Sequence, residues 1–101
     1  MVRFEIEDDS CRRLYTKEKG AERYPAGVVD AFFEALEVIH AAADIRDLYR
    51  LKAFHVEKLK GKNWKRGEKS IRLNDQYRLV FRMEKDEKGT LLVVMKLVDY
   101  H

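Results

Sequence analysis

A chain of 101 residues can bury one hydrophobic core, so residues 1–101 are expected to form a single domain. The hydrophobic fraction of 46% is ordinary for a globular protein and argues against disorder. A single cysteine, Cys11, excludes an internal disulfide framework, and no apolar run reaches the roughly 20 residues that span a bilayer. We therefore expect a cytoplasmic protein with no membrane partner. Since CxxC and Cys/His zinc patterns are absent, no metal or cofactor is expected.

The net charge of +3 conceals an uneven distribution. Residues 1–44 hold six Lys/Arg and ten Asp/Glu, whereas residues 46–72 hold ten Lys/Arg and three Asp/Glu, a local charge of +7. Residues 73–101 are balanced, with five of each. Such a basic segment is typical either of a solvated loop face or of a surface that binds a polyanion such as nucleic acid.

The first half of the chain predicts one strand and two helices. Strict alternation of apolar and polar residues over 2–7 predicts a half-buried strand. A short helix is expected over residues 10–18 with Cys11, Leu14 and Tyr15 as its apolar positions. Apolar residues at spacings of three and four predict a longer amphipathic helix over residues 25–43, and a helical turn is expected in residues 44–51. The apolar face of the longer helix comprises Val28, Val29, Phe32, Phe33, Leu36, Ile39 and Ala43.

The second half predicts strands. A weakly alternating strand is expected over residues 53–59, followed by an exposed basic loop over 60–69. Residues 69–74 and 77–83 predict an antiparallel hairpin with Tyr77, Leu79, Phe81 and Met83 inward. The last strand begins at Leu91 and looks buried on both faces. The fold class is therefore α+β, with an N-terminal strand and two helices packed on an antiparallel sheet of three to five strands.

The hairpin and the last strand also carry the residues that could form a site. Two arginines of the hairpin lie on the face opposite the inward set, and an acid, a phenol and an imidazole follow the last strand. A histidine and a lysine flank the start of the basic loop and could join them. The candidate residues are His55, Lys60, Arg72, Arg78, Asp99, Tyr100 and His101.

These side chains suit cleavage of an RNA phosphodiester. An imidazole can take the proton from the ribose 2′-hydroxyl or give one to the leaving 5′-oxygen near neutral pH. The planar fork of an arginine binds two phosphate oxygens at once. The residues alone leave other interpretations open: the arginines could be a solvated sheet face, the final triplet could be accidental, and a non-catalytic nucleic-acid-binding module is at least as well supported.

Three motifs in residues 54–101 resemble HigB-type toxins of the RelE/ParE superfamily, the toxin halves of bacterial toxin–antitoxin pairs. The first is the histidine and LKG of FHVEKLKG, and the third is the final DYH. The second is the hairpin SIRLNDQYRLVF, which is similar to the family pattern S-I-x-x-N-x-x-x-R-x-x-F. The loop over residues 61–69 is longer and more basic than the family pattern.

The resemblance implies a RelE-like fold and an endoribonuclease that cleaves messenger RNA in the A site of the 70S ribosome without a metal. His55 and His101 would then share the acid/base work, Tyr100 would stack on or orient a base, and Asp99 would orient a group or balance charge. The phosphate-contacting residues would be Lys60, Arg72 and Arg78.

The expected partners follow from the same resemblance. They are the ribosome, its messenger RNA and a helix-turn-helix antitoxin similar to HigA, with DNA reached only indirectly through that antitoxin. Two alternatives come from other functional classes: a non-enzymatic gyrase inhibitor like the ParE branch, and a non-toxic RNA-binding module. ParE-like proteins usually lack the final Asp-Tyr-His triplet, which argues against the first alternative.

Overall fold

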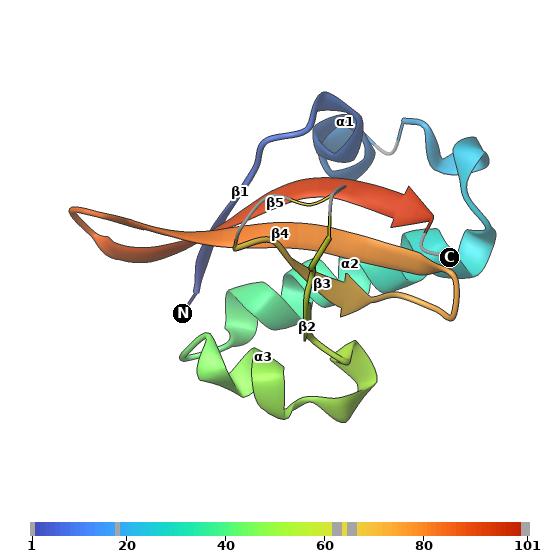
Figure 1. The fold of residues 1–101 in the computed structure, drawn as a ribbon. Helices are drawn as coiled ribbons and strands as arrows, with labels where there is room; N and C mark the ends of the chain where they lie inside the picture. Colours follow the sequence, from blue (N-terminus) through green and yellow to red (C-terminus); the bar gives the residue numbers. More distant parts are fainter. Residues whose placement is uncertain (1, 18, 62–63, 65–66, 100–101) are drawn as a thin grey trace.

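The computed structural model describes residues 2–17, 19–61, 64 and 67–99 (Figure 1). Helices and strands follow one another in the order that the hydrophobic pattern predicts. In chain order the elements are β1 (Arg3–Ile6), α1 (Asp9–Lys17), the 3-10 turn η1 (Ala21–Arg23), α2 (Ala26–Ala41), α3 (Arg46–Arg50), the 3-10 turn η2 (Lys52–Phe54), β2 (Glu57–Lys58), β3 (Lys69–Arg72), β4 (Tyr77–Asp86) and β5 (Gly89–Asp99). The α+β fold class is confirmed. The turn expected in residues 44–51 is the short helix α3.

The strands form one five-stranded sheet in the order β1-β5-β4-β3-β2. The hairpins β3–β4 and β4–β5 are antiparallel, as predicted. One pairing differs from the expected antiparallel sheet, because β1 runs parallel to β5 and makes the sheet mixed. The reason is the long connection: a parallel pair needs a crossover rather than a tight turn, and the helices lie between β1 and β5 in the chain.

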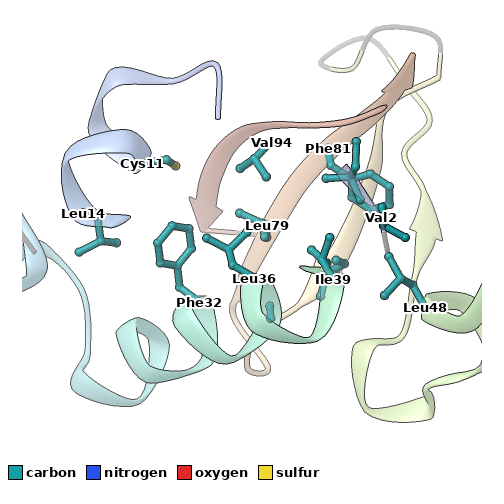
Figure 2. Close-up of a cluster of buried hydrophobic side chains, with 13 residues drawn as sticks. Val2, Cys11, Leu14, Phe32, Leu36, Ile39, Leu48, Leu79, Phe81 and Val94 are labelled. Atoms are coloured by element: carbon teal, nitrogen blue, oxygen red, sulfur yellow. The ribbon is translucent and has the colours of Figure 1, made fainter. Parts of the chain in front are cut away.

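The main core lies between the helices and one face of the sheet (Figure 2). Phe32, Leu36 and Ile39 of α2 point from the helix toward the strands and are fully buried. Alternation along the strands places every second residue on this face, and the buried strand residues are Ile71, Leu79, Phe81, Leu92 and Val94. The predicted apolar face of α2 is confirmed except at its end, where Ala43 is exposed because the helix stops at Ala41.

Helix α1 begins at a residue that caps it. The side chain of Asp8 accepts a hydrogen bond from the backbone N–H of Cys11 at 3.0 Å, and its carbonyl accepts one from Arg12 at 2.9 Å. Cys11 and Leu14 are buried, as predicted. Tyr15 is 40% exposed, because its ring lies at the edge of the core with its centroid 5.8 Å from that of Phe4.

The prediction of a strand over residues 53–59 was largely wrong. Residues 52–54 form η2, and only Glu57 and Lys58 pair with β3. The chain turns at this point because His55 adopts a left-handed backbone conformation, with φ 42° and ψ 58°. Its N–H donates to the carbonyl of Lys52 at 3.1 Å, which closes the 3-10 turn.

A bulge interrupts the central pairing of β4 with β5. Val80 pairs with Lys96 and Phe81 pairs with Val94, so Met95 is an extra residue on β5. The strand is buried on both faces only before the bulge, where residues 91–94 are consecutively buried. After the bulge the side chains are half-buried, and Leu97 returns to the helix side of the sheet.

Trp64, which lies between β2 and β3 in the chain, packs on the face of the sheet opposite the helices. The ammonium of Lys96 on β5 lies 5.3 Å from the centre of the Trp64 ring, although β3 and β4 separate β5 from β2 in the sheet. Leu59, Val80 and Val93 are buried on this face. The prediction of an exposed loop over residues 60–69 was therefore wrong for part of its length, because Trp64 is half-buried and Glu68 is buried.

The two neighbouring phenylalanines of α2 provide a test of the core. Phe32→Ala should lower the free energy of unfolding by about 3–5 kcal/mol, because it leaves a cavity in a fully buried site. Phe33→Ala is the matched control and should cost less, because Phe33 is only partly buried. Urea denaturation of both variants measures the difference. Equal losses would show that the buried face of α2 is misassigned.

The single thiol provides a second test. Burial, with a smaller contribution from the Asp8 carboxylate, raises the pKa of Cys11 to about 12. The thiol should therefore stay protonated and unreactive toward a disulfide reagent at pH 8 while the protein is folded. It should react at the rate of a free thiol in denaturant. Rapid reaction of the folded protein would contradict the burial of Cys11.

Candidate functional site

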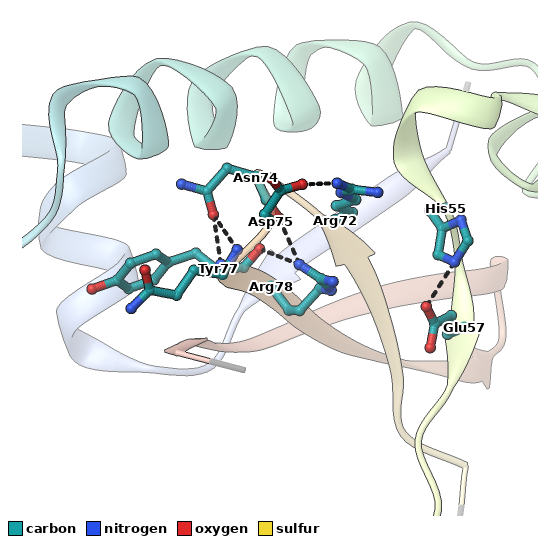
Figure 3. A network of polar contacts seen from close by, with 8 residues as sticks. His55, Glu57, Arg72, Asn74, Asp75, Tyr77 and Arg78 are labelled. Carbon is teal, nitrogen blue, oxygen red and sulfur yellow. Dashed lines mark hydrogen bonds and ion pairs between the residues drawn. The ribbon is translucent and has the colours of Figure 1, made fainter. Parts of the chain in front are cut away.

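Two arginines face each other across the β3–β4 hairpin. Arg72 and Arg78 are directly paired residues, so their side chains project from the same face, opposite the helices, as predicted (Figure 3). Arg72 forms an ion pair with Asp75 of the turn. The planar fork of a guanidinium can bind two phosphate oxygens at once. Two such groups on one face are therefore suited to an anionic group that approaches this face.

The backbone of the turn holds Arg78 in one orientation. Its Nη1 donates to the carbonyl oxygen of Asn74 at 2.6 Å and to that of Tyr77 at 3.2 Å. Arg78 is only 9% exposed, whereas the side chain of Arg72 is 40% exposed. Arg78 is thus a fixed cation at the base of the site, and Arg72 is a cation at its surface.

Asn74 shapes the turn that carries these contacts. Its Oδ1 accepts hydrogen bonds from the backbone N–H groups of Gln76 at 2.8 Å and Tyr77 at 2.6 Å, an arrangement that mimics a backbone turn. The sequence prediction placed a turn at Asp75 and Gln76 but did not identify Asn74 as its organising residue. The signal was present, because asparagine at the start of a short connection between two strands favours this geometry.

His55 lies at the same end of the hairpin. Glu57 pairs with Ser70 of β3, and the turn η2 that immediately precedes His55 packs against β3, so His55 lies near the Arg72 end of that strand. His55 is exposed, and it follows η2 rather than lying in the predicted strand. Its Nε2 lies 2.8 Å from Oε1 of Glu57 (Figure 3). If Nε2 carries the proton in the neutral ring, Nδ1 carries the lone pair and can accept a proton.

Glu57 is therefore a site residue that the sequence prediction missed. Its carboxylate orients the imidazole of His55 and forms an ion pair when that ring is protonated. Alternation along the strand predicted over residues 53–59 puts His55 and Glu57 on the same side, and this was the sequence signal for a contact between them. The pairing could not be read from that alone, because His55 lies outside the strand.

Asp99 ends β5 at the rim of the site. It pairs with Tyr77 rather than with Arg78, so alternation places it on the helix side of the sheet end. Its Oδ2 accepts a hydrogen bond from Nε2 of Gln76 at 2.9 Å. Tyr100 and His101, which the sequence analysis also selected, lie outside the described residues.

Lys60 lies away from the arginine pair. It is exposed and follows Leu59, whose N–H donates to the carbonyl of Glu68 at 2.9 Å. It lies five positions after His55, which corresponds to roughly 16 Å in an extended chain. The structure brings together His55, Arg72 and Arg78 at one end of the sheet, with Asp99 at its rim, and leaves Lys60 toward the other end.

The described residues contain neither a metal-binding cluster nor a membrane-spanning helix. No group of three or more His, Cys, Asp and Glu side chains in this part of the chain is arranged to hold a metal ion. No helix within it is both long and apolar enough to cross a membrane.

Residues 4–101 match the model of a protein family described as the HigB-like toxin, a RelE-like toxin of a type II toxin–antitoxin system. The chain belongs to the HigB-like toxin family. A curated relative, an uncharacterized protein from Haemophilus influenzae, is 33% identical over 91 residues, which cover 90% of this chain and 88% of that protein. The resemblance seen in the sequence motifs is therefore confirmed at the level of the family.

Solved structures show that the HigB-like chain shares its fold with other toxins of this superfamily. A YoeB/ParE toxin from Agrobacterium tumefaciens has a TM-score of 0.60 at 18% identity and covers 99% of this chain and 100% of its own. A YoeB–YefM complex from Staphylococcus aureus gives a TM-score of 0.53 at 21% identity over 100% of this chain and 98% of its own. The RelE-like fold expected from the sequence is thus confirmed.

The backbone of His55 can be tested separately from its imidazole. A residue with a Cβ is disfavoured at φ 42°, so His55→Gly should leave the free energy of unfolding unchanged or higher. His55→Val should lower it by about 1–2 kcal/mol, because a branched side chain is poorly tolerated in this region. Thermal or urea unfolding measures both. A valine variant as stable as the glycine variant would contradict the left-handed geometry.

Proposed function

We propose that this HigB-like protein is a ribosome-dependent endoribonuclease that cleaves messenger RNA in the A site by metal-independent acid/base catalysis. The observation that carries the proposal is the direct pairing of Arg72 with Arg78 across the hairpin, at the sheet end that also holds His55. Membership of a family of toxins supports the biological setting.

The arginine pair supplies the electrostatic part of the mechanism. Negative charge builds on the non-bridging oxygens when the ribose 2′-oxygen attacks the phosphorus, and cations fixed in advance stabilise that charge. Arg78 is held by two backbone carbonyls and needs little reorganisation, while the more exposed Arg72 can adjust to the phosphate. Lys60 would contact a phosphate further along the strand, in keeping with its distance from the pair.

The imidazoles supply the proton transfers. His55 and His101 would share two roles, the base that takes the proton of the 2′-hydroxyl and the acid that protonates the leaving 5′-oxygen. Glu57 orients the His55 ring through the 2.8 Å contact. Tyr100 would stack on or orient a base next to the scissile phosphate. Asp99, at the end of β5, would orient one of these groups or balance the charge of a protonated imidazole.

The proposed partners complete this function. In the cytoplasm the toxin would bind the 70S ribosome and its messenger RNA, and a helix-turn-helix antitoxin similar to HigA would neutralise it. DNA would be reached only through that antitoxin. The similar Staphylococcus aureus structure is a YoeB–YefM complex, which supports a protein partner for this chain.

Cleavage of messenger RNA on programmed ribosomes tests the proposal. Deletion of His101 and the substitution His55→Ala should each lower the single-turnover rate by about 10²- to 10⁴-fold, the usual contribution of a general acid or base. Arg72→Ala should also lower the rate, because a phosphate cation is lost. Arg46→Ala is the matched control, since Arg46 is an exposed arginine that is likewise ion-paired to a nearby carboxylate. Melting temperatures of all variants establish that they are folded.

The outcomes separate the candidate functions. A wild-type rate after loss of His101 would contradict the proposed chemistry. Growth arrest without any RNA cleavage would favour a gyrase inhibitor like the ParE branch. RNA binding with neither arrest nor cleavage would favour a non-toxic RNA-binding module.

A further inference from the structure

A second basic site lies outside the residues discussed above. A hollow of about 230 Å³ opens between α1 and η1. The residues of its lining that bear on binding are Ser10, Arg13, Lys19, Glu22, Arg23 and Tyr24. We call it the α1–η1 hollow. It belongs to the acidic first half of the sequence, where a cluster of cations is unexpected.

The cations of the α1–η1 hollow differ from most arginines of this protein. Arg13, Lys19 and Arg23 are exposed and form no ion pair with another described residue. By contrast, six arginines of the described chain are each paired with a carboxylate, namely Arg3, Arg12, Arg46, Arg50, Arg72 and Arg82. The lining includes one carboxylate, Glu22, beside these three cations, so its formal charge is +2.

An aromatic contact joins this hollow to the end of β5. The rings of Tyr24 and Tyr77 meet edge to face, with centroids 5.9 Å apart, and Tyr77 is paired with Asp99 in the sheet. Figure 1 shows the end of β5 pointing toward the segment that links α1 to α2. The phenol of a tyrosine is uncharged near neutral pH and does not repel a phosphate, and burial raises the pKa of Tyr24 further.

We propose that the α1–η1 hollow binds a backbone phosphate of an RNA strand that passes the end of β5. Arg13, Lys19 and Arg23 would contact the phosphate oxygens, and the half-buried Tyr24 would form an apolar wall for the adjacent sugar or base. This inference rests on the proposed function, because it extends the RNA path from the arginine pair across the Asp99 rim. The RNA is either the substrate strand or ribosomal RNA, which share this chemistry.

Charge reversal within and outside the hollow tests the inference. The variants are Arg13→Glu, Arg23→Glu and the control Lys85→Glu, each in the full chain. Lys85 is exposed and pairs with Thr90, at the opposite end of the β4–β5 hairpin from Asp99. The probe is a short single-stranded 2′-O-methyl oligoribonucleotide, which cannot be cleaved at its sugar. Fluorescence anisotropy at several salt concentrations gives the affinity and its salt dependence.

For a substrate strand in the hollow, we expect each hollow variant to weaken oligonucleotide binding about tenfold at low salt and to reduce the logarithmic salt slope by about 0.7 for each lost phosphate contact. Lys85→Glu should change the affinity less than twofold. A purely structural role for the arginines would lower the melting temperature without this change in salt slope, so both are measured.

A second arm identifies the source of the RNA. Binding to vacant 70S ribosomes that carry no messenger RNA is compared for the same four proteins. Loss on ribosomes with unchanged oligonucleotide binding assigns ribosomal RNA to the hollow, and loss on the oligonucleotide assigns the substrate strand. Hollow variants that match Lys85→Glu in both arms would overturn the inference.

Cleavage by the wild-type protein is measured in parallel, so that the two proposals fail separately. If the wild-type protein cleaves messenger RNA and the hollow variants bind both the oligonucleotide and the ribosome normally, only the inference about the hollow is rejected. If RNA binding depends on the hollow but the wild-type protein does not cleave messenger RNA on the ribosome, only the proposed nuclease activity is rejected.

Discussion

The antiparallel ladder between β4 and β5 is the interaction on which the rest of this structure depends. It continues from Tyr77 opposite Asp99 to Asp86 opposite Gly89, and β5 also carries the edge strand β1. The helices bury their apolar faces on the residues that this pairing holds in alternation, Leu79 and Phe81 on one strand and Leu92 and Val94 on the other. Because the same ladder places Arg78 and Asp99 at one end of the sheet, packing and site share one set of backbone hydrogen bonds.

The bulge at Met95 separates a part of β5 that is buried on both faces from a part that ends at the exposed rim of the sheet. Before it, residues 91–94 are consecutively buried, both on the face that the helices cover and on the opposite face. After it, the strand continues to the half-exposed rim that ends in Asp99. Without the extra residue, Leu97 would face away from the helices and the register at the site would shift by one side chain.

The sequence predicted much of this architecture because the hydrophobic periods are long and regular. The face of α2 and the alternation from Tyr77 to Met83 were correct for that reason. The strand around His55 was wrong because a single left-handed residue converts an apolar–polar alternation into a turn, and no period signals that event. The parallel pairing of β1 and the fold-back of Trp64 toward Lys96 were missed because both join residues far apart in the chain.

The sequence predicted which types of residue form the candidate site, but not how all of them are placed relative to one another. Arg72 and Arg78 could be placed on one face because they belong to one hairpin, whose register follows from its turn. Lys60 was grouped with them by charge alone, and the short β2 carries it toward the other end of the sheet. Glu57 was missed as a partner of His55 because its role depends on the turn that precedes β2.

The parallel partnership of β1 with β5 has a consequence for how this protein is made. Arg3 pairs with Leu91, 88 residues later, and β5 is synthesised after every other described element. While β5 is still inside the ribosomal exit tunnel, β1 has no neighbour, β4 lacks one of its two partners, and the helices have no complete face to cover. The strands β2, β3 and β4 can pair with one another before that point, but β1 joins the sheet and the core closes only after β5 has emerged.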